Sequence, residues 1–261
     1  MTRVVFHTVL GNVSNLQHLI AHLVEQKAGR IVGVIIDDVD KYCNIESDKL
    51  IEVVARDYSE SLMRKGISKV QLIGYSMGGL IALEVARLFM EQGVDICNLS
   101  LIDTVPINYQ IKSDIILELL FITNFGITAE DIYAGINNQE LKEAILAVFN
   151  EESNCLTDDD LENLKNIQKY ANVYRCLEAI SKIAQEKRFE CYVNAIQRLR
   201  EKSIPIDILR QYFKVYKKSV EASNFSPLPY FGDIQFLKPI EPINHMFVKS
   251  VDIDSVWNDI C

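Results

Sequence analysis

A serine flanked by glycines is the strongest chemical signal in this chain. Residues 70–84 read VQLIGYSMGGLIALE, so that Ser76 stands between Gly74 and Gly78. An apolar run ends at Ile73 and an apolar-periodic run starts at about Gly78, which is the strand–turn–helix setting that a reactive serine needs. So tight a turn strains the serine backbone and leaves no room for bulky neighbours. The spacing predicts a serine nucleophile at a helix N-terminus, where developing negative charge is stabilised. An inert serine in a glycine-rich turn is the competing interpretation.

Asp103 is the candidate acid of a catalytic triad. A serine is a poor nucleophile without a base, and the base needs an acid to orient it. Asp103 follows the strand-like run 99–102, about one helix and one strand after Ser76. Ligand sites of parallel sheets gather at such carboxyl ends of strands. A capping role in the next turn is the alternative. Weaker candidates end an earlier strand: Asp37, Asp38 and Asp40.

Two backbone N–H groups are expected to form an oxyanion hole. One should come from Met77, directly after the serine. The other should come from the loop at residues 6–11, which reads FHTVLG after the first expected strand. We place this second donor at Val9, with Thr8 as its neighbour, because Gly11 lets the loop turn back towards the site.

The chain has only four histidines from which to draw a base. His245 is the only one after Asp103, and the order Ser, acid, His makes it the candidate base. The competing interpretation is that His245 lies on the surface or contacts the helical segment 109–222 without a catalytic role. His7 lies beside the expected oxyanion loop and could approach Ser76, although a structural role at a strand end is favoured.

Composition excludes several classes of function. The chain has 261 residues, 24% of them charged and 49% hydrophobic, as in an ordinary soluble globular protein. Its net charge of −9 argues against nucleic-acid binding. The apolar stretch 115–127 is too short to span a membrane, and no secretory signal is present, so a cytoplasmic protein is expected. Six scattered cysteines predict no metal site, and a solvated surface is favoured for the pair His18 and His22, four residues apart on one helix face.

The elements that must position these residues alternate between strand and helix. Such alternation predicts an α/β fold with a mostly parallel central sheet flanked by helices. Residues 109–222 are almost wholly helical in pattern, and a strand-like run then returns the chain to the sheet. We therefore expect an α/β core at 1–108 and 223–261 and a helical lid at 109–222. The apolar residues of the lid either form a wall for an acyl chain or pack the helices against one another. Expected strands are 3–6, 31–36, 70–73, 99–102 and 233–237, expected helices are 15–26, 48–64 and 78–92, and expected helix starts are Thr128-x-x-Asp131 and Thr157-x-x-Asp160.

Together these segments resemble the thioesterase domains of nonribosomal peptide and polyketide synthases, which have the α/β-hydrolase fold. The resemblance spans nearly the whole chain, although the lid matches only in helical character. It implies Ser76 as acyl acceptor, Asp103 as triad acid, and Val9 and Met77 as oxyanion donors. It also implies that no cofactor is needed, because the substrate arrives as a thioester on the phosphopantetheine arm of an acyl or peptidyl carrier protein. The matching segments are FHTVLG at 6–11, GYSMGGLIALEVA at 74–86, LID at 101–103 and PLPYFGDIQFL at 227–237.

The chain departs from this family at its C-terminal end. The family's base follows the last strand, at a position that would fall beyond Cys261, so a truncated C-terminus is expected. The leading hypothesis is a thioesterase that releases its product by hydrolysis or macrocyclisation. A non-catalytic acyl or carrier-protein binding module of the same fold is the second hypothesis, and a small-ester carboxylesterase is the third.

Overall fold

The computed structural model describes residues 1–261 except 28, 108, 151, 239–256 and 258–261. Contacts within the chain divide it into two units, which are described separately. The first contains the described residues of Met1–Asn108 and Lys218–Ile240, together with Trp257, and the second contains those of Tyr109–Lys217. The expected limit of the lid at residue 222 stays a prediction.

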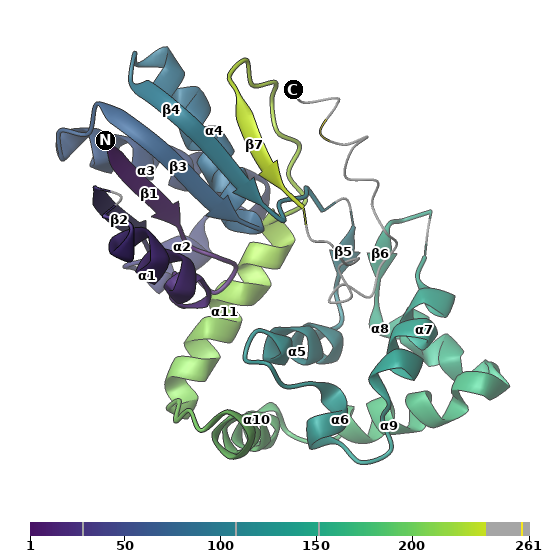
Figure 1. Ribbon diagram of the computed structural model, residues 1–261. Coiled ribbons are helices and arrows are strands. Elements are labelled where there is room, and N and C mark those ends of the chain that lie inside the picture. Colours follow the sequence, from purple (N-terminus) through teal and green to yellow (C-terminus); the bar gives the residue numbers. More distant parts are fainter. Residues whose placement is uncertain (28, 108, 151, 239–256, 258–261) are drawn as a thin grey trace. The chain divides into compact units, whose positions relative to one another are not determined.

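A five-stranded parallel sheet forms the centre of the first unit. Its strands lie in the order β2-β1-β3-β4-β7, and every neighbouring pair is parallel (Figure 1). The observed strands overlap all five expected runs, because buried parallel strands read as continuous β-branched and apolar segments. Their bounds are β1 Thr2–Phe6, β2 Arg30–Val34, β3 Lys69–Tyr75, β4 Asp95–Ile102 and β7 Ile234–Leu237.

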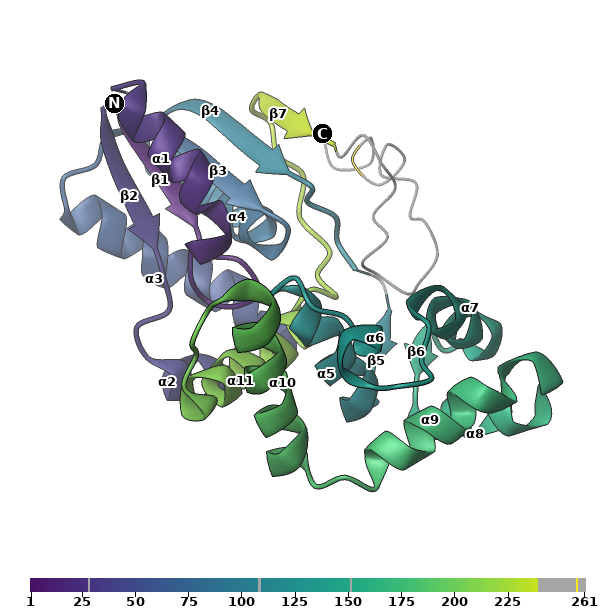
Figure 2. The same cartoon turned by 60° about the horizontal axis from the view of Figure 1, so that its bottom comes forward.

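Helices cover both faces of this sheet (Figure 2). On the α1 face, the buried residues Val5, Leu16 and Ile73 form one apolar cluster. On the other face, Phe6 packs against Tyr58 of α3 with ring centroids 6.5 Å apart. The arrangement confirms the expected α/β fold. The helices of this unit are η1 Ser14–Leu16, α1 Gln17–Glu25, α2 Val39–Asn44, η2 Ser47–Lys49, α3 Leu50–Arg64, α4 Met77–Glu91 and the last residues of α11 Ile206–Ala222.

Helix α2 was not expected from the sequence. It begins after Asp38, whose side chain accepts a hydrogen bond from the Lys41 backbone N–H at 2.9 Å. An aspartate in this place satisfies one of the free N–H groups of the first helical turn. Asp38, a weaker candidate for the triad acid, is therefore a helix cap.

The second unit is mostly helical, as the sequence indicates. It also contains a short parallel pair formed by β5 Gln110–Ile111 and β6 Cys155–Leu156. Two-residue strands are too short to leave a periodic pattern in the sequence. The helices are α5 Asp114–Thr123, α6 Ala129–Ile132, α7 Asn138–Val148, α8 Asp158–Glu162, η3 Asn163–Asn166, η4 Gln168–Tyr170, α9 Ala171–Ser181, α10 Gln185–Arg200 and most of α11.

Both expected helix starts in this unit are capping boxes. The Thr128 backbone N–H donates to the Asp131 carboxylate at 2.8 Å, and the Thr157 N–H donates to Asp160 at the same distance. Each acid also lies in the first turn of its helix, where it complements the helix dipole.

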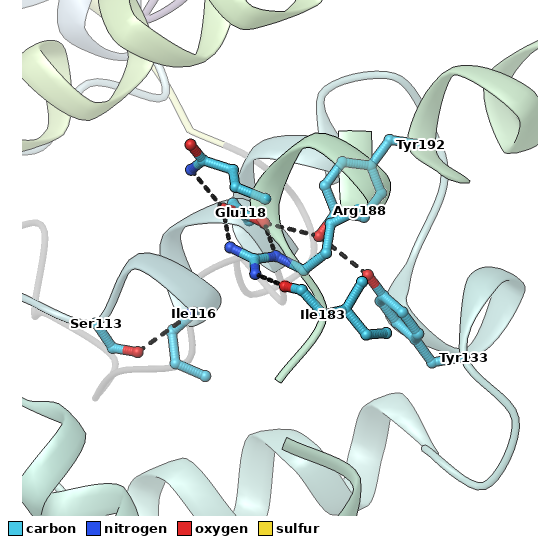
Figure 3. A network of polar contacts seen from close by, with 8 residues as sticks. Ser113, Ile116, Glu118, Tyr133, Ile183, Arg188 and Tyr192 are labelled. Atoms are coloured by element: carbon cyan, nitrogen blue, oxygen red, sulfur yellow. Dashed lines mark hydrogen bonds and ion pairs between the residues drawn. The ribbon is translucent and has the colours of Figure 1, made fainter. Parts of the chain in front are cut away.

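Aromatic rings and one buried ion pair form the core of the second unit. Phe121 of α5 packs against Phe189 of α10 and Phe213 of α11, with ring centroids 6.4 and 5.3 Å away. The lid residues that the sequence offered as an acyl-chain wall thus include at least one that packs the helices. On the same helix, Glu118 is fully buried and pairs with Arg188 of α10 (Figure 3).

Among the described residues, no helix has both the length and the apolar character needed to cross a membrane.

Candidate active site

Ser76 forms a strained turn between β3 and α4. Its backbone has φ 53° and ψ −125°, a conformation that costs a non-glycine residue about 1–3 kcal/mol and persists only where the surroundings hold it. Two backbone hydrogen bonds of 2.9 Å hold it here: the Ser76 N–H donates to Ile102 C=O, and the Gly79 N–H donates to Ser76 C=O. The half-buried serine therefore stands at the N-terminus of a 15-residue helix, as the motif predicts.

The glycines beside Ser76 are required by close approach of the backbone. A Cβ at Gly74 would overlap the backbone of Gly78 and Gly79, across the turn. A Cβ at Gly78 would lie 2.5 Å from the His7 carbonyl oxygen. These contacts let the first turn of α4 pack directly onto the end of β1, so the serine and the loop after β1 are brought to one edge of the sheet.

Asp103 lies beside Ser76 because their strands are neighbours in register. Tyr75, the last residue of β3, pairs with Ile102, the last residue of β4. Ser76 follows directly after β3, and Asp103 follows directly after β4, so the two residues leave the sheet side by side. Asp103 also has a positive φ, 47°, and its N–H donates to Leu237 C=O of β7 at 2.9 Å. Burial and the Asp103 carboxylate both raise the pKa of Tyr75, which places that charge at this edge.

The turn after Asp103 is held by Thr104 and Trp257. Thr104 is fully buried, and its hydroxyl donates to Ile102 C=O at 3.1 Å. The indole N–H of Trp257 donates to Thr104 C=O at 2.9 Å, and its ring packs on Phe236 with centroids 5.4 Å apart. Trp257 thus braces the acid-bearing turn, a role that its position in the sequence did not reveal.

The loop after β1 is closed by its own hydrogen bonds. The Thr8 N–H donates to Asn12 C=O at 3.1 Å, the Gly11 N–H donates to Thr8 C=O at 2.9 Å, and the Leu10 N–H reaches the Thr8 hydroxyl at 3.4 Å. Within the described part of the chain, these bonds leave the Val9 N–H without an acceptor. Met77, the first residue of α4, offers a second N–H of the kind that helix starts leave unpaired.

The three histidines that the structure describes lie in two different environments. His7 is fully buried, and both of its ring nitrogens make hydrogen bonds: Nδ1 lies 2.9 Å from Thr8 O, and Nε2 lies 3.0 Å from Tyr58 Oη. His18 and His22 are exposed on α1. His245, the expected base, lies outside the described residues, so its role stays a prediction.

Tyr42 adds a contact that the sequence did not suggest. Its hydroxyl lies 2.9 Å from Ser219 Oγ on α11 and 3.9 Å from Met77 Sδ, and burial raises its pKa. Its ring also meets the edge of the His7 ring, with centroids 6.1 Å apart. Tyr42 belongs to the unexpected helix α2, and the three residues it contacts are far away in the chain, so no local pattern marks it.

The buried His7 predicts a loss of stability in acid. Burial lowers the pKa of His7 from 6.5 to about 4. Between these two values the unfolded chain binds a proton that the folded protein does not, so acid favours unfolding. The free energy of unfolding should fall by about 3 kcal/mol as the pH drops from about 6.5 to about 4. Urea denaturation across this range, compared with His7→Asn, isolates the effect, and equal pH slopes for both proteins would contradict it.

The described residues contain no group of three or more His, Cys, Asp or Glu side chains that could hold a metal ion. What the site does bring together is a hydroxyl at a helix N-terminus and a carboxylate at the end of the neighbouring strand, with the loop after β1 at the same edge of the sheet. Such an arrangement suits nucleophilic attack on an acyl group with stabilisation of an oxyanion.

The chain is similar to several known proteins. Pyochelin synthetase PchF of Pseudomonas aeruginosa strain PAO1 is 31% identical over 125 residues, which are 48% of this chain and 7% of that protein. The same protein of strain UCBPP-PA14 is 30% identical over 125 residues. The solved structure of holo-AB3403, a four-domain nonribosomal peptide synthetase bound to AMP and glycine, matches with a TM-score of 0.63 and 17% identity over 100% of this chain, a likeness that shows the fold. The chain spans only 17% of that structure's chain.

A model of the thioesterase domain family matches residues 4–206, well over half of the chain. The matched range includes the loop after β1, the turn at Ser76 and the acid at Asp103. With its parallel sheet and flanking helices, the chain has the α/β-hydrolase fold and belongs to the thioesterase domain family.

Proposed function

We propose that this protein releases an acyl or peptidyl chain from the phosphopantetheine thioester of a carrier protein, through an acyl-enzyme on Ser76. The observation that carries the proposal is the strained backbone of Ser76 at the start of α4, with Asp103 opposite in register. A strained non-glycine conformation is kept where function requires it, and here it presents a hydroxyl to the helix N-terminus.

In the first half of the reaction, Ser76 Oγ attacks the thioester carbonyl carbon while its proton passes to a histidine. The carbonyl oxygen becomes an oxyanion, which accepts hydrogen bonds from the Val9 and Met77 N–H groups. When the carbon–oxygen double bond re-forms, the carbon–sulfur bond breaks and the proton moves from the histidine to the departing sulfur. The products are a Ser76 ester and the free thiol of the carrier arm.

In the second half, water or a nucleophile within the acyl chain attacks the ester carbon. The attacking atom gives its proton to the histidine, and Ser76 Oγ recovers a proton as it leaves. Water yields a free acid, and an internal nucleophile yields a macrocycle. The carboxylate of Asp103 orients the histidine and stabilises its charged form.

We propose His245 as that base, because it is the only histidine that follows Asp103 in the chain. No resident cofactor takes part in either half of the reaction, since the thioester is already activated and the carrier arm delivers it. The matched relatives are synthetases, one of them a nonribosomal peptide synthetase, which supports a substrate carried on a protein rather than a free ester.

The choice of substrate can be tested with one acyl group in three forms: on a carrier-protein arm, on N-acetylcysteamine and as an ethyl ester. We expect kcat/KM for the carrier-bound thioester to exceed that for the free thioester by at least about tenfold, because contacts remote from the reacting carbon contribute to transition-state binding. Turnover by the Ser76→Ala variant gives the rate without the serine hydroxyl in each assay.

The other two hypotheses predict different results. A carboxylesterase would hydrolyse the ethyl ester at least as well as the carrier-bound thioester. A non-catalytic binding module would bind the loaded carrier, yet release no product and show no burst of free thiol. Either result would contradict the proposed function.

A further inference from the structure

The Thr8–Val9 peptide is held by two hydrogen bonds to one atom. The Thr8 carbonyl oxygen accepts from the Gly11 N–H and from His7 Nδ1, each at 2.9 Å. The carbonyl of Thr8 and the N–H of Val9 belong to the same peptide group, which is planar and has these two bonds pointing in opposite directions. Fixing the direction of the Thr8 carbonyl therefore fixes the direction of the Val9 N–H.

The two contacts of His7 determine which ring nitrogen carries the proton. A carbonyl oxygen can only accept, so Nδ1 must donate to Thr8 O. In the neutral ring Nε2 then has a lone pair, which accepts the Tyr58 hydroxyl proton at 3.0 Å. Burial keeps the ring neutral by lowering the pKa of His7 to about 4. Both nitrogens are thus occupied, and His7 has no lone pair with which to take a proton from Ser76.

The surroundings of His7 make its orientation rigid. The rings of Tyr42 and Tyr58 meet its ring nearly at right angles, with centroids 6.1 and 5.7 Å away. His7 directly follows Phe6, the last residue of β1, and the backbone carbonyl of His7 lies against Gly78 in the first turn of α4. A strand end, two tyrosines and the helix that begins beside Ser76 together hold the donor in place.

We propose that His7 is a positioning residue for the oxyanion hole. Its Nδ1–H, together with the Gly11 N–H, clamps the Thr8–Val9 peptide so that the Val9 N–H points to where the thioester oxygen gains negative charge. Two donors on the carbonyl also polarise the peptide and strengthen its N–H as a donor. This inference rests on the proposed function, in which Val9 supplies one of the two oxyanion contacts.

Two substitutions of His7 separate the clamp from simple packing. Asparagine places an amide N–H near the position of Nδ1, whereas glutamine places its amide near Nε2 and leaves Thr8 O without this donor. We expect His7→Gln to lower kcat by about 10- to 100-fold with little change in KM, because an oxyanion contact exists only in the transition state. His7→Asn should recover most of that loss. His22→Gln, on an exposed histidine of α1, is the matched control and should leave both constants unchanged.

Rates are measured per active site, titrated with a fluorophosphonate that labels Ser76, so that misfolded protein does not enter kcat. Equal kcat for the Gln and Asn variants, or a kcat of His7→Gln equal to that of the unaltered protein, would overturn the inference. Failure of the unaltered protein to become labelled at Ser76 would instead overturn the proposed function.

The proton on His7 gives a second readout that needs no variant. ¹⁵N NMR of the unaltered protein at pH 7 should show His7 as the neutral tautomer protonated at Nδ1. Protonation at Nε2 would contradict the clamp even if both variants failed to fold.

Discussion

Replacing Ser76 with alanine is expected to lower kcat for thioester release by about 10⁴- to 10⁶-fold, with KM changed much less. The size follows from the role of the residue: without Oγ no acyl-enzyme forms, and the remaining amides and acid can only assist direct attack by water. The backbone strain at Ser76 is the same for alanine as for serine, so the variant should fold with an unfolding free energy within about 0.5 kcal/mol of the original.

Two measurements check this expectation. Steady-state release of a carrier-bound thioester gives kcat and KM, and a fluorophosphonate probe followed by mass spectrometry identifies the labelled residue. Ser181, an exposed serine at the end of α9, supplies the matched control, and Ser181→Ala should keep full activity and full labelling. Labelling of the Ser76→Ala variant to the same extent as the original, or retention of its turnover, would show that another residue is the nucleophile.

Removing either partner of the buried pair between Glu118 and Arg188 should cost the folded protein about 3–5 kcal/mol. The Glu118 side chain is 0% exposed and that of Arg188 is 7% exposed, so the remaining charge could not reach water. Arg188 binds Glu118 through two N–H groups, each 2.7 Å from a carboxylate oxygen. Loss of one partner therefore leaves an uncompensated buried charge, which is among the largest destabilising changes known for single substitutions.

Two further side chains complete the hydrogen bonding of the Glu118 carboxylate. The Tyr192 hydroxyl donates to it at 2.9 Å and the Gln185 amide at 2.8 Å, while the Arg188 guanidinium also donates to Ile183 C=O at 2.5 Å (Figure 3). Each of these hydrogen bonds has a charged donor or acceptor, and together they hold α5 against α10 in one geometry. Deleting either member should loosen the whole helical unit rather than one contact.

Urea denaturation of Glu118→Ala and Arg188→Ala tests this expectation. The exposed ion pair between Glu178 of α9 and Lys182, directly after that helix, is the matched control, and Lys182→Ala should change the free energy of unfolding by no more than about 0.5 kcal/mol. The double variant Glu118→Leu with Arg188→Met should recover much of the loss, because apolar side chains of similar size can replace a buried pair. A loss below about 1 kcal/mol for both single variants would contradict the buried pair.

Local sequence patterns predicted most of the fold. Each strand of the sheet was recognisable as an apolar run, and α1, α3 and α4 were recognisable by apolar periodicity. Both capping boxes were predicted from four-residue motifs. Helix α2 and the pair β5–β6 were missed, because a six-residue helix and two-residue strands do not repeat often enough to show a period.

Some features of the candidate site were likewise predictable from the sequence, and others were not. The turn at Ser76 was predictable because its glycines lie within four residues of one another and the strain is local. Asp103 was predictable because parallel strands bring their carboxyl ends to one edge. The partners of His7 were not predictable: Tyr58 is 51 residues away, and nothing in the local sequence of either residue indicates the other.

By itself, therefore, the sequence determined the alternation of the sheet strands with α1, α3 and α4, the strained turn at Ser76 and the place of Asp103 at the end of the neighbouring strand, since each depends on residues that are neighbours in the chain or in a regular alternation. Only the tertiary structure decided that His7 is a buried neutral donor to Thr8 rather than a base, and that Glu118 and Arg188 form one buried network. The physical reason is the same for both. The charge and protonation state of such a group depend on burial and on hydrogen-bond partners from distant segments, and folding alone brings these together.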